Sequence, residues 1–280
     1  MKLFIITLAL NMMVASIHAN TEYTEPKDPN YLDSSTDVRR QTDPWNGKKC
    51  AVVMTYDDAL NVHLDHAIPH LDSAGFKGTF YISASFEGFR NRHDDWRKAA
   101  AHGHELGNHT LFHPCDGSKP GREWVNRDYD LSKYTIQRIM DEIRINQFIL
   151  EETDGKKIRS FAYTCGDMNA GDNSFKEMLP DLFNSARGVR SAMNTPGSID
   201  LYNIDSYMIS GQSGDELIRL VDEAMRGGKL LVFLFHGVGG EHSLDVSLEA
   251  HRQLVNYLKQ HESEIMVDTM AGIAEHIRKK

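Results

Sequence analysis

The chain has 280 residues, of which 40% are hydrophobic and 25% are charged, a composition that is ordinary for a soluble globular protein. This length allows one large buried core, and α/β barrels of about 200–250 residues routinely form a single domain. A formal net charge of −9 argues against nucleic acid as a partner, because a phosphate-binding surface needs a clustered excess of Lys and Arg.

The first residues have the pattern of a secretory signal peptide. Lys2 precedes an apolar run over residues 3–17, and residues suited to cleavage follow it, ending at Ala19. The run is short for a membrane span, and an uncleaved signal anchor is the alternative. We expect residues 1–19 to be removed on export and the mature protein to be periplasmic or secreted, without a stable membrane span.

Residues 20–48 are polar and lack helical or alternating periodicity, which predicts an N-terminal arm or linker. From Cys50 onward, short apolar runs that predict buried strands alternate with helical patterns. Strands are expected at residues 51–56, 77–82, 104–108, 159–162, 229–235 and 265–267. Helices are expected at residues 64–75 with a stop at Gly75, after an N-cap at Ser132, at 174–183, at 215–226, and on both sides of the last strand.

Strands that alternate with helices imply β-α units and a parallel sheet. At least six such units, with no Gly-rich phosphate loop after the first strand, favour a barrel over a dinucleotide-binding open sheet. We therefore predict an α/β fold over residues 49–280, a distorted parallel (β/α) barrel of about seven strands. In such a barrel the chemistry collects at the C-terminal ends of the strands.

Two adjacent acids, Asp57 and Asp58, end the first predicted strand. Each carboxylate raises the proton affinity of the other unless a cation neutralises one of them, which suggests a metal site with a base beside it. The alternative is a pair of N-cap residues for the next helix, since Asp is a favoured cap.

Two histidines four residues apart, His109 and His113, follow the third predicted strand. At this spacing they can lie on one face of a helical turn, and neutral imidazole is a common ligand for zinc. Thr110 could hold that turn by bonding to local backbone, and the alternative is a pair of surface histidines. The H-E-x-x-H pattern of zinc proteases is excluded, because His104 and His109 would lie about 140° apart around a helix.

His236 ends the strongest predicted strand, at the place where a catalytic general acid would sit in this architecture. The alternative is a histidine satisfied by backbone contacts. After the fourth strand, the turn at Cys165 and Gly166 could present a backbone N–H to a developing oxyanion.

Together these segments resemble the motifs of the polysaccharide deacetylase family, also called carbohydrate esterase family four or the NodB-homology domain. The family's T-F-D-D-G motif resembles residues 55–59, with Ala59 in place of Gly, and its H-[ST]-x-x-H motif is matched by residues 109–113. A variant F-A-Y-P-[YF]-G form of the third motif resembles residues 161–166, and the final L-x-H motif is matched by residues 234–236. The matches run in the family's order across nearly all of the mature chain.

The resemblance implies a role for each of these residues. Asp58, His109 and His113 would bind one divalent metal ion, usually zinc in this family. Asp57 would act as the general base on the metal-activated water. His236 would protonate the leaving amine or alcohol.

The third motif implies a substrate-facing turn, in which the backbone N–H of Cys165 would hold the oxyanion and Tyr163 would lie against the substrate. This motif lacks the family's usual Arg, so another residue must orient Asp57. The family's Asp-Trp motif has no clear counterpart, and the stretch nearest in position is Asp205-Ser206-Tyr207.

The chain has three cysteines, Cys50, Cys115 and Cys165. An oxidising compartment permits a disulfide between two of them, and at least one cysteine then stays without a disulfide partner in the chain. Cys115 closely follows the histidine pair, and Cys165 lies in the third motif. A Cys115–Cys165 bridge beside the site is therefore a hypothesis, which rests on their closeness to motif residues.

The resemblance implies a metal-dependent hydrolase that removes acetyl groups from a polysaccharide or oligosaccharide, foremost N-acetyl groups of an amino-sugar polymer of the peptidoglycan or chitin type. Two alternatives within the family are an acetylxylan-type O-acetyl esterase and an inactive carbohydrate-binding homologue. A glycoside hydrolase on a barrel would need two acids that flank the scissile bond, and Asp57-Asp58 backed by two histidines fits metal binding better. The expected partner is an acetylated carbohydrate.

Overall fold

The computed structural model describes residues 44–280. The predicted signal peptide, residues 1–19, and nearly all of the predicted arm, residues 20–48, lie outside the described residues. Trp45 is 1% exposed, and its indole N–H donates a hydrogen bond to the carbonyl of Gly228 at 2.9 Å. The last residues of the predicted arm are thus packed into the core.

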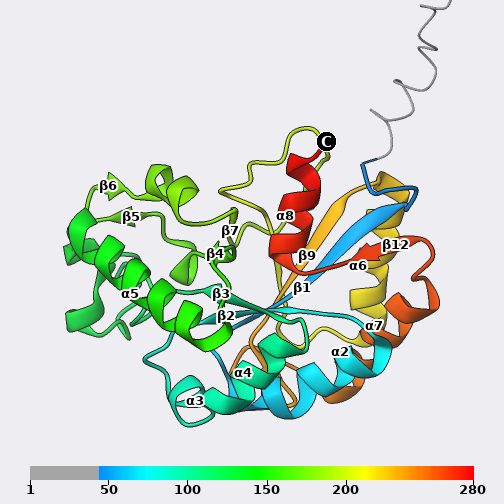
Figure 1. Cartoon of the computed structure of the whole chain (residues 1–280), viewed down its shortest axis with the longest axis horizontal. Helices are drawn as coiled ribbons and strands as arrows, with labels where there is room; N and C mark the ends of the chain where they lie inside the picture. The colour runs from blue at the N-terminus through cyan, green and yellow to red at the C-terminus, as the bar shows by residue number, and fades with distance from the viewer. Residues whose placement is uncertain (1–43) are drawn as a thin grey trace, which may run out of the picture. The chain divides into compact units, whose positions relative to one another are not determined.

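A parallel sheet forms the centre of the structure, curled into a half-barrel with helices around it (Figure 1). Its strand order is β7-β4-β3-β2-β1-β9-β8, and β12 pairs with β1 beside this path. The strands are β1 Cys50–Asp57, β2 Thr79–Ile82, β3 Glu105–Asn108, β4 Ser160–Ala162, β7 Ser185–Arg187, β8 Tyr207–Met208, β9 Leu230–Phe235 and β12 Ile265–Val267. Every pairing between these strands is parallel, so the predicted distorted parallel barrel is confirmed.

Helices connect most of these strands. They are α2 Ile68–Ala74, α3 Glu87–Arg90, α4 His93–Ala101, α5 Ile136–Asp154, α6 Gly214–Gly227, α7 Leu248–Gln260 and α8 Met270–Arg278. Two small two-stranded sheets lie outside the main sheet, one formed by β5 Asn169–Ala170 and β6 Asn173–Ser174, the other by β10 Gly237–Val238 and β11 Asp245–Val246. Gly75 ends α2 at a left-handed φ of 76°, as predicted. Ser213 begins α6 in a capping box with Glu216. Within residues 44–280, no helix has the length and apolarity that a membrane crossing requires.

Two predicted helices differ from the structure. The N-cap of α5 is Thr135 rather than Ser132, because Thr135 accepts the N–H of Arg138 while Ser132 lies in a preceding 3-10 turn. The helix predicted at residues 174–183 is only a 3-10 helix, Lys176–Asp181, which contains a proline that cannot donate a backbone hydrogen bond. The elements α3, α4, β7 and β8 have no sequence-based prediction.

Alternation along β1 sends its side chains to two different faces. The outward side chains belong to the core cluster that contains residues of α2, α6 and α7, and they are Cys50, Val52, Met54 and Tyr56. Ala51 and Val53 point the opposite way, into a cluster with Trp45 and residues of α8. Asp57 continues this inward series at the C-terminal end of the strand.

The parallel register brings the C-terminal ends of the strands to one edge of the sheet. Asp57 lies level with Tyr81 of β2, and Tyr81 lies level with Gly107 of β3. A Cβ atom on Gly107 would lie 2.4 Å from the ring of Tyr81, so glycine leaves room for that ring. On the far side of β3, Ala162 of β4 lies level with Arg187 of β7. Polar residues at these strand ends therefore share one edge.

Buried histidines predict an acid-sensitive fold. His104 and His251 are fully buried, and burial lowers the pKa of His104 to about 4 and that of His251 to about 3. In the unfolded chain both rings take up protons near pH 6.5, so acidification stabilises the unfolded state relative to the fold as the pH falls from about 6.5 toward 4. The free energy of unfolding in urea should therefore be lower at about pH 5 than at about pH 7.5.

A conservative variant tests this assignment. In His104→Asn, the side-chain oxygen can keep the hydrogen bond that His104 Nδ1 accepts from the N–H of Gly78 at 3.1 Å, without titrating. This variant should lose less stability on acidification than the unmodified protein. The control His102→Asn alters a mainly exposed ring and should behave like the unmodified protein. Equal losses in the two variants would contradict the role of His104.

Candidate metal centre

Three residues predicted as metal ligands converge at the C-terminal edge of the sheet. Asp58 follows β1, while His109 and His113 lie in the loop after β3, and one ligand atom from each lies within 4.8 Å of the others. Nε2 of His113 is 3.4 Å from Asp58 Oδ1, and Nε2 of His109 is 3.7 Å from the same oxygen. Two imidazole nitrogens and a carboxylate oxygen form a ligand set that zinc and similar ions accept.

A backbone hydrogen bond orients the ring of His109. Its Nδ1 lies 2.8 Å from the carbonyl oxygen of Ala162 on β4, so Nδ1 carries the proton and donates it. Nε2 is then unprotonated and faces Asp58. Burial lowers the pKa of His109 to about 4, so the ring is neutral near neutral pH and can act as a ligand.

Asp58 is a buried carboxylate with unused capacity to bind a cation. It is 9% exposed, and its Oδ1 accepts no hydrogen bond from the described part of the chain. Burial favours the neutral acid, but the charges of His113, His109 and His236 outweigh this effect and lower the pKa of Asp58. An orphaned oxygen of this kind costs free energy, which a bound cation would offset. The three residues therefore fit a divalent ion.

Left-handed backbone positions shape the metal loop, and the helical turn predicted there is wrong. Thr110 and His113 have φ values of 62° and 53°, so residues 109–113 form an irregular loop. Thr110 Oγ1 accepts a hydrogen bond from the N–H of His113 at 3.0 Å, the local role predicted for it. Asp58 at 79° and Ala59 at 52° are left-handed too. Non-glycine residues in this region cost about 1–3 kcal/mol each and cluster at functional sites.

Arg187 is the partner of Asp57 that the sequence motifs lack. Nη2 of this fully buried residue lies 2.7 Å from Oδ1 and 2.5 Å from Oδ2 of Asp57. Arg187 ends β7, the neighbour of β4, so the guanidinium comes from the strand beside the third motif rather than from the motif itself. This charge-assisted contact holds the carboxylate in one orientation. Its only sequence signal is a lone Arg at the end of a very short strand.

His236 reaches the same centre from the end of β9. Its Nε2 lies 3.9 Å from Asp58 Oδ2, and its Nδ1 has no hydrogen-bond partner in the part of the chain that the structure describes. Burial lowers the pKa of this ring. His242, which has no sequence-based prediction, stacks on it with ring centroids 4.6 Å apart. Asp205, from the stretch nearest the Asp-Trp motif, pairs with Arg190 instead.

A disulfide between Cys115 and Cys165 confirms the bridge hypothesised from the sequence, and Cys50 is a buried free thiol. The bridge joins the loop after His113 to the turn after β4, where Cys165 has a φ of 53°. Tyr163 does not lie against the site. It is 1% exposed, and its hydroxyl donates to the carbonyl of Tyr202 at 2.9 Å, so its predicted contact with substrate is wrong.

Comparison with known sequences finds relatives over part of the chain. The family model for polysaccharide deacetylase matches residues 46–176. The chain is 30% identical to the uncharacterized protein YlxY of Bacillus subtilis (strain 168) over 122 residues, which cover 44% of this chain and 31% of YlxY. The chain thus spans less than a third of the length of the curated relatives it matches.

Solved structures share the fold. PdaA of Bacillus subtilis, a family 4 carbohydrate esterase, matches with a TM-score of 0.54 and 13% identity, covering 90% of this chain and 92% of that chain. The peptidoglycan deacetylase PdaC of Bacillus subtilis matches with a TM-score of 0.50 and 16% identity, covering 85% and 94%. At such identities the likeness concerns the arrangement of strands and helices.

The converging ligands predict one divalent ion per chain. Asp58→Ala removes one of three ligands and should weaken Zn²⁺ binding by on the order of 100-fold or more. The affinity is measured by calorimetric titration of the chelator-stripped protein. The matched control is Asp94→Ala, which removes a carboxylate that is 81% exposed and should leave the affinity unchanged. Stoichiometric zinc retained by Asp58→Ala after dialysis would show that the ligand assignment is wrong.

Proposed function

We propose that this chain, which belongs to the polysaccharide deacetylase family, is an exported metal-dependent hydrolase that removes acetyl groups from a glycan. One observation carries the proposal: two adjacent acids have separate partners. Asp58 lies with His109 and His113, whereas Asp57 is paired with Arg187. A cation-binding group with an oriented base beside it is what hydrolysis by activated water requires.

Asp57 is the general base in this proposal. Its Oδ2 lies 3.8 Å from Nε2 of His109, so the carboxylate borders the ligand set while Arg187 orients it. From this place it can accept the proton of a water that attacks the acetyl carbonyl. A divalent ion, most simply zinc, held by the three ligands would polarise the carbonyl and lower the pKa of water toward about 7.

His236 and Cys165 complete the proposed chemistry. Burial lowers the pKa of the His236 ring, which makes its protonated form a stronger acid toward a poor leaving group. The backbone N–H of Cys165 would donate a hydrogen bond to the oxyanion, from a turn that the disulfide anchors. No side chain needs to form a covalent intermediate.

The substrate we propose is the N-acetyl group of an amino-sugar polymer of the peptidoglycan or chitin type. Such polymers lie outside the cytoplasm, where a protein with the N-terminal pattern of residues 1–19 would act. Removal of O-acetyl groups, as from acetylxylan, is the second candidate. No residue among 44–280 bonds to Nδ1 of His236, so no partner orients this ring as a general acid. This favours the second candidate, because an alcohol leaves more readily than an amine and needs less help from a general acid.

Acetate release tests the proposal directly. The protein should release acetate from N-acetylglucosamine hexamer faster than from acetylxylan. A zinc chelator should reduce this rate by at least about 100-fold, because the acetyl carbonyl and the attacking water both depend on the ion, and added Zn²⁺ should restore it.

Other outcomes lead to different conclusions. Activity that resists the chelator would overturn the metal mechanism. Faster release from acetylxylan would favour the second candidate. No acetate from either polymer, with binding retained, would mean an inactive carbohydrate-binding homologue.

A further inference from the structure

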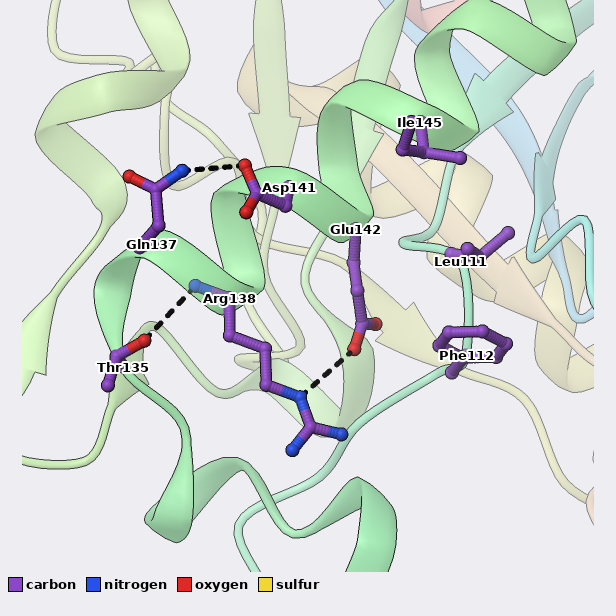
Figure 2. A pocket seen from close by; sticks show the side chains of 8 residues that line it. All are labelled: Leu111, Phe112, Thr135, Gln137, Arg138, Asp141, Glu142 and Ile145. Carbon is purple, nitrogen blue, oxygen red and sulfur yellow. Dashed lines mark hydrogen bonds and ion pairs between the residues drawn. The ribbon is translucent and has the colours of Figure 1, made fainter.

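A shallow, open cavity of about 420 Å³ lies between the metal loop, residues 109–113, and the first turns of α5 (Figure 2). Leu111 and Phe112, which separate the ligands His109 and His113 in the sequence, form one wall. The volume is within the range of about 300–1,000 Å³ that is typical of small-molecule sites. The segment that carries two metal ligands therefore also lines a second concave surface.

The apolar part of this cavity presents a flat aromatic ring. Phe112 is 36% exposed, and its ring stacks on that of Tyr129 with centroids 5.0 Å apart, so its orientation is supported from behind. Ile145 of α5, 51% exposed, extends the apolar surface from the other wall. An exposed ring next to an aliphatic side chain suits the apolar face of a sugar ring, which packs on aromatic surfaces.

The polar part of the cavity offers donors and acceptors of both charges. Gln137 Nε2 donates to Asp141 Oδ1 at 2.7 Å, which holds both side chains at the rim. The side chains of Arg138 and Asp141 are 49% and 59% exposed. A rim with one cation, one anion and one amide does not select a charged ligand. It suits the hydroxyl groups of a neutral sugar, which donate and accept hydrogen bonds.

Glu142 is a buried acid in the lining of this cavity, and its side chain is 7% exposed. Burial raises its pKa, and the Tyr134 hydroxyl, the Phe112 N–H and Arg138 act in the opposite direction. Arg138 Nε lies 3.9 Å from its Oε1, and Figure 2 marks this ion pair with a dashed line. Two carboxyl oxygens can accept more hydrogen bonds than these few neighbours donate, so a ligand hydroxyl can donate another.

We propose that this cavity is a distal glycan subsite, which binds one neutral sugar ring of the same chain whose acetyl group is removed at the metal centre. The inference rests on the proposed function and extends it to the length of the substrate. Leu111 and Phe112 connect the two sites within one five-residue loop. In this proposal a hexamer occupies both sites, whereas a dimer occupies the metal centre alone.

Substrate length separates this subsite from the metal centre. Ile145→Ala and Gln137→Ala should each raise the KM for N-acetylglucosamine hexamer roughly tenfold, the effect of one lost contact in a binding pocket, and leave kcat unchanged. The KM for the dimer should not change. The matched control is Phe148→Ala, which truncates a residue of the same helix that is 60% exposed and does not line the cavity.

The outcomes distinguish failure of the subsite from failure of the proposed function. If the unmodified protein releases acetate but the KM for the hexamer is the same in both cavity variants, the subsite is wrong and the function stands. If no oligomer yields acetate, calorimetric binding of the hexamer decides. Weaker binding by Ile145→Ala than by Phe148→Ala would support the subsite, and equal binding, or none by the unmodified protein, would overturn it.

Discussion

A buried ion pair between Arg187 and Asp57 is the interaction on which the site depends. Arg187 is fully buried and Asp57 is 3% exposed, so both charges lie away from water, where loss of either partner is costly. The pair links β7 to β1, and the guanidinium also packs over the ring of Tyr81 at 5.0 Å. Because Asp57 is paired with Arg187, Asp58 is the acid of the two that can bind the proposed cation.

The backbone keeps the two adjacent acids with different partners. Asp57 ends β1, whereas Asp58 follows it in a left-handed conformation and meets the two histidines. His113 and Cys165 are left-handed as well, and the Cys115–Cys165 disulfide ties their two segments together. These conformations cost stability, which the hydrophobic layer on the outer face of the sheet offsets. The three proposed ligands are thereby held with one ligand atom each within 4.8 Å of the others.

Local patterns predicted the parallel barrel, because short apolar runs are contained within single strands. The ligand set stays a prediction, which came from the order of several motifs along the chain and not from any one of them. Local patterns could not predict the pairing of Arg187 with Asp57, because the two residues are 130 positions apart in the sequence. The strand that carries Arg187 has three residues, too few to show an alternating pattern. The loop at residues 109–113 was predicted as a helical turn, because Thr110 and His113 have positive φ values but neither is a glycine, the residue from which a positive φ is usually predicted. Tyr163 lies two residues after Phe161 on an extended segment, so both side chains point to the same face and pack in one core cluster. This packing is the reason why the predicted contact of Tyr163 with substrate is wrong.

The most direct test of this account is the turnover of Arg187→Lys in the metal-loaded protein. Lysine keeps the positive charge but lacks the second nitrogen that donates to the carbonyl of Gly188 and the planar group that packs over Tyr81, so its ammonium is not held against Asp57 in the same way. With zinc content and urea midpoint close to those of the unmodified protein, kcat for acetate release should fall by about 100-fold or more, the contribution of a positioned general base. Unchanged kcat in a folded, zinc-loaded variant would contradict the central claim that this ion pair positions the base.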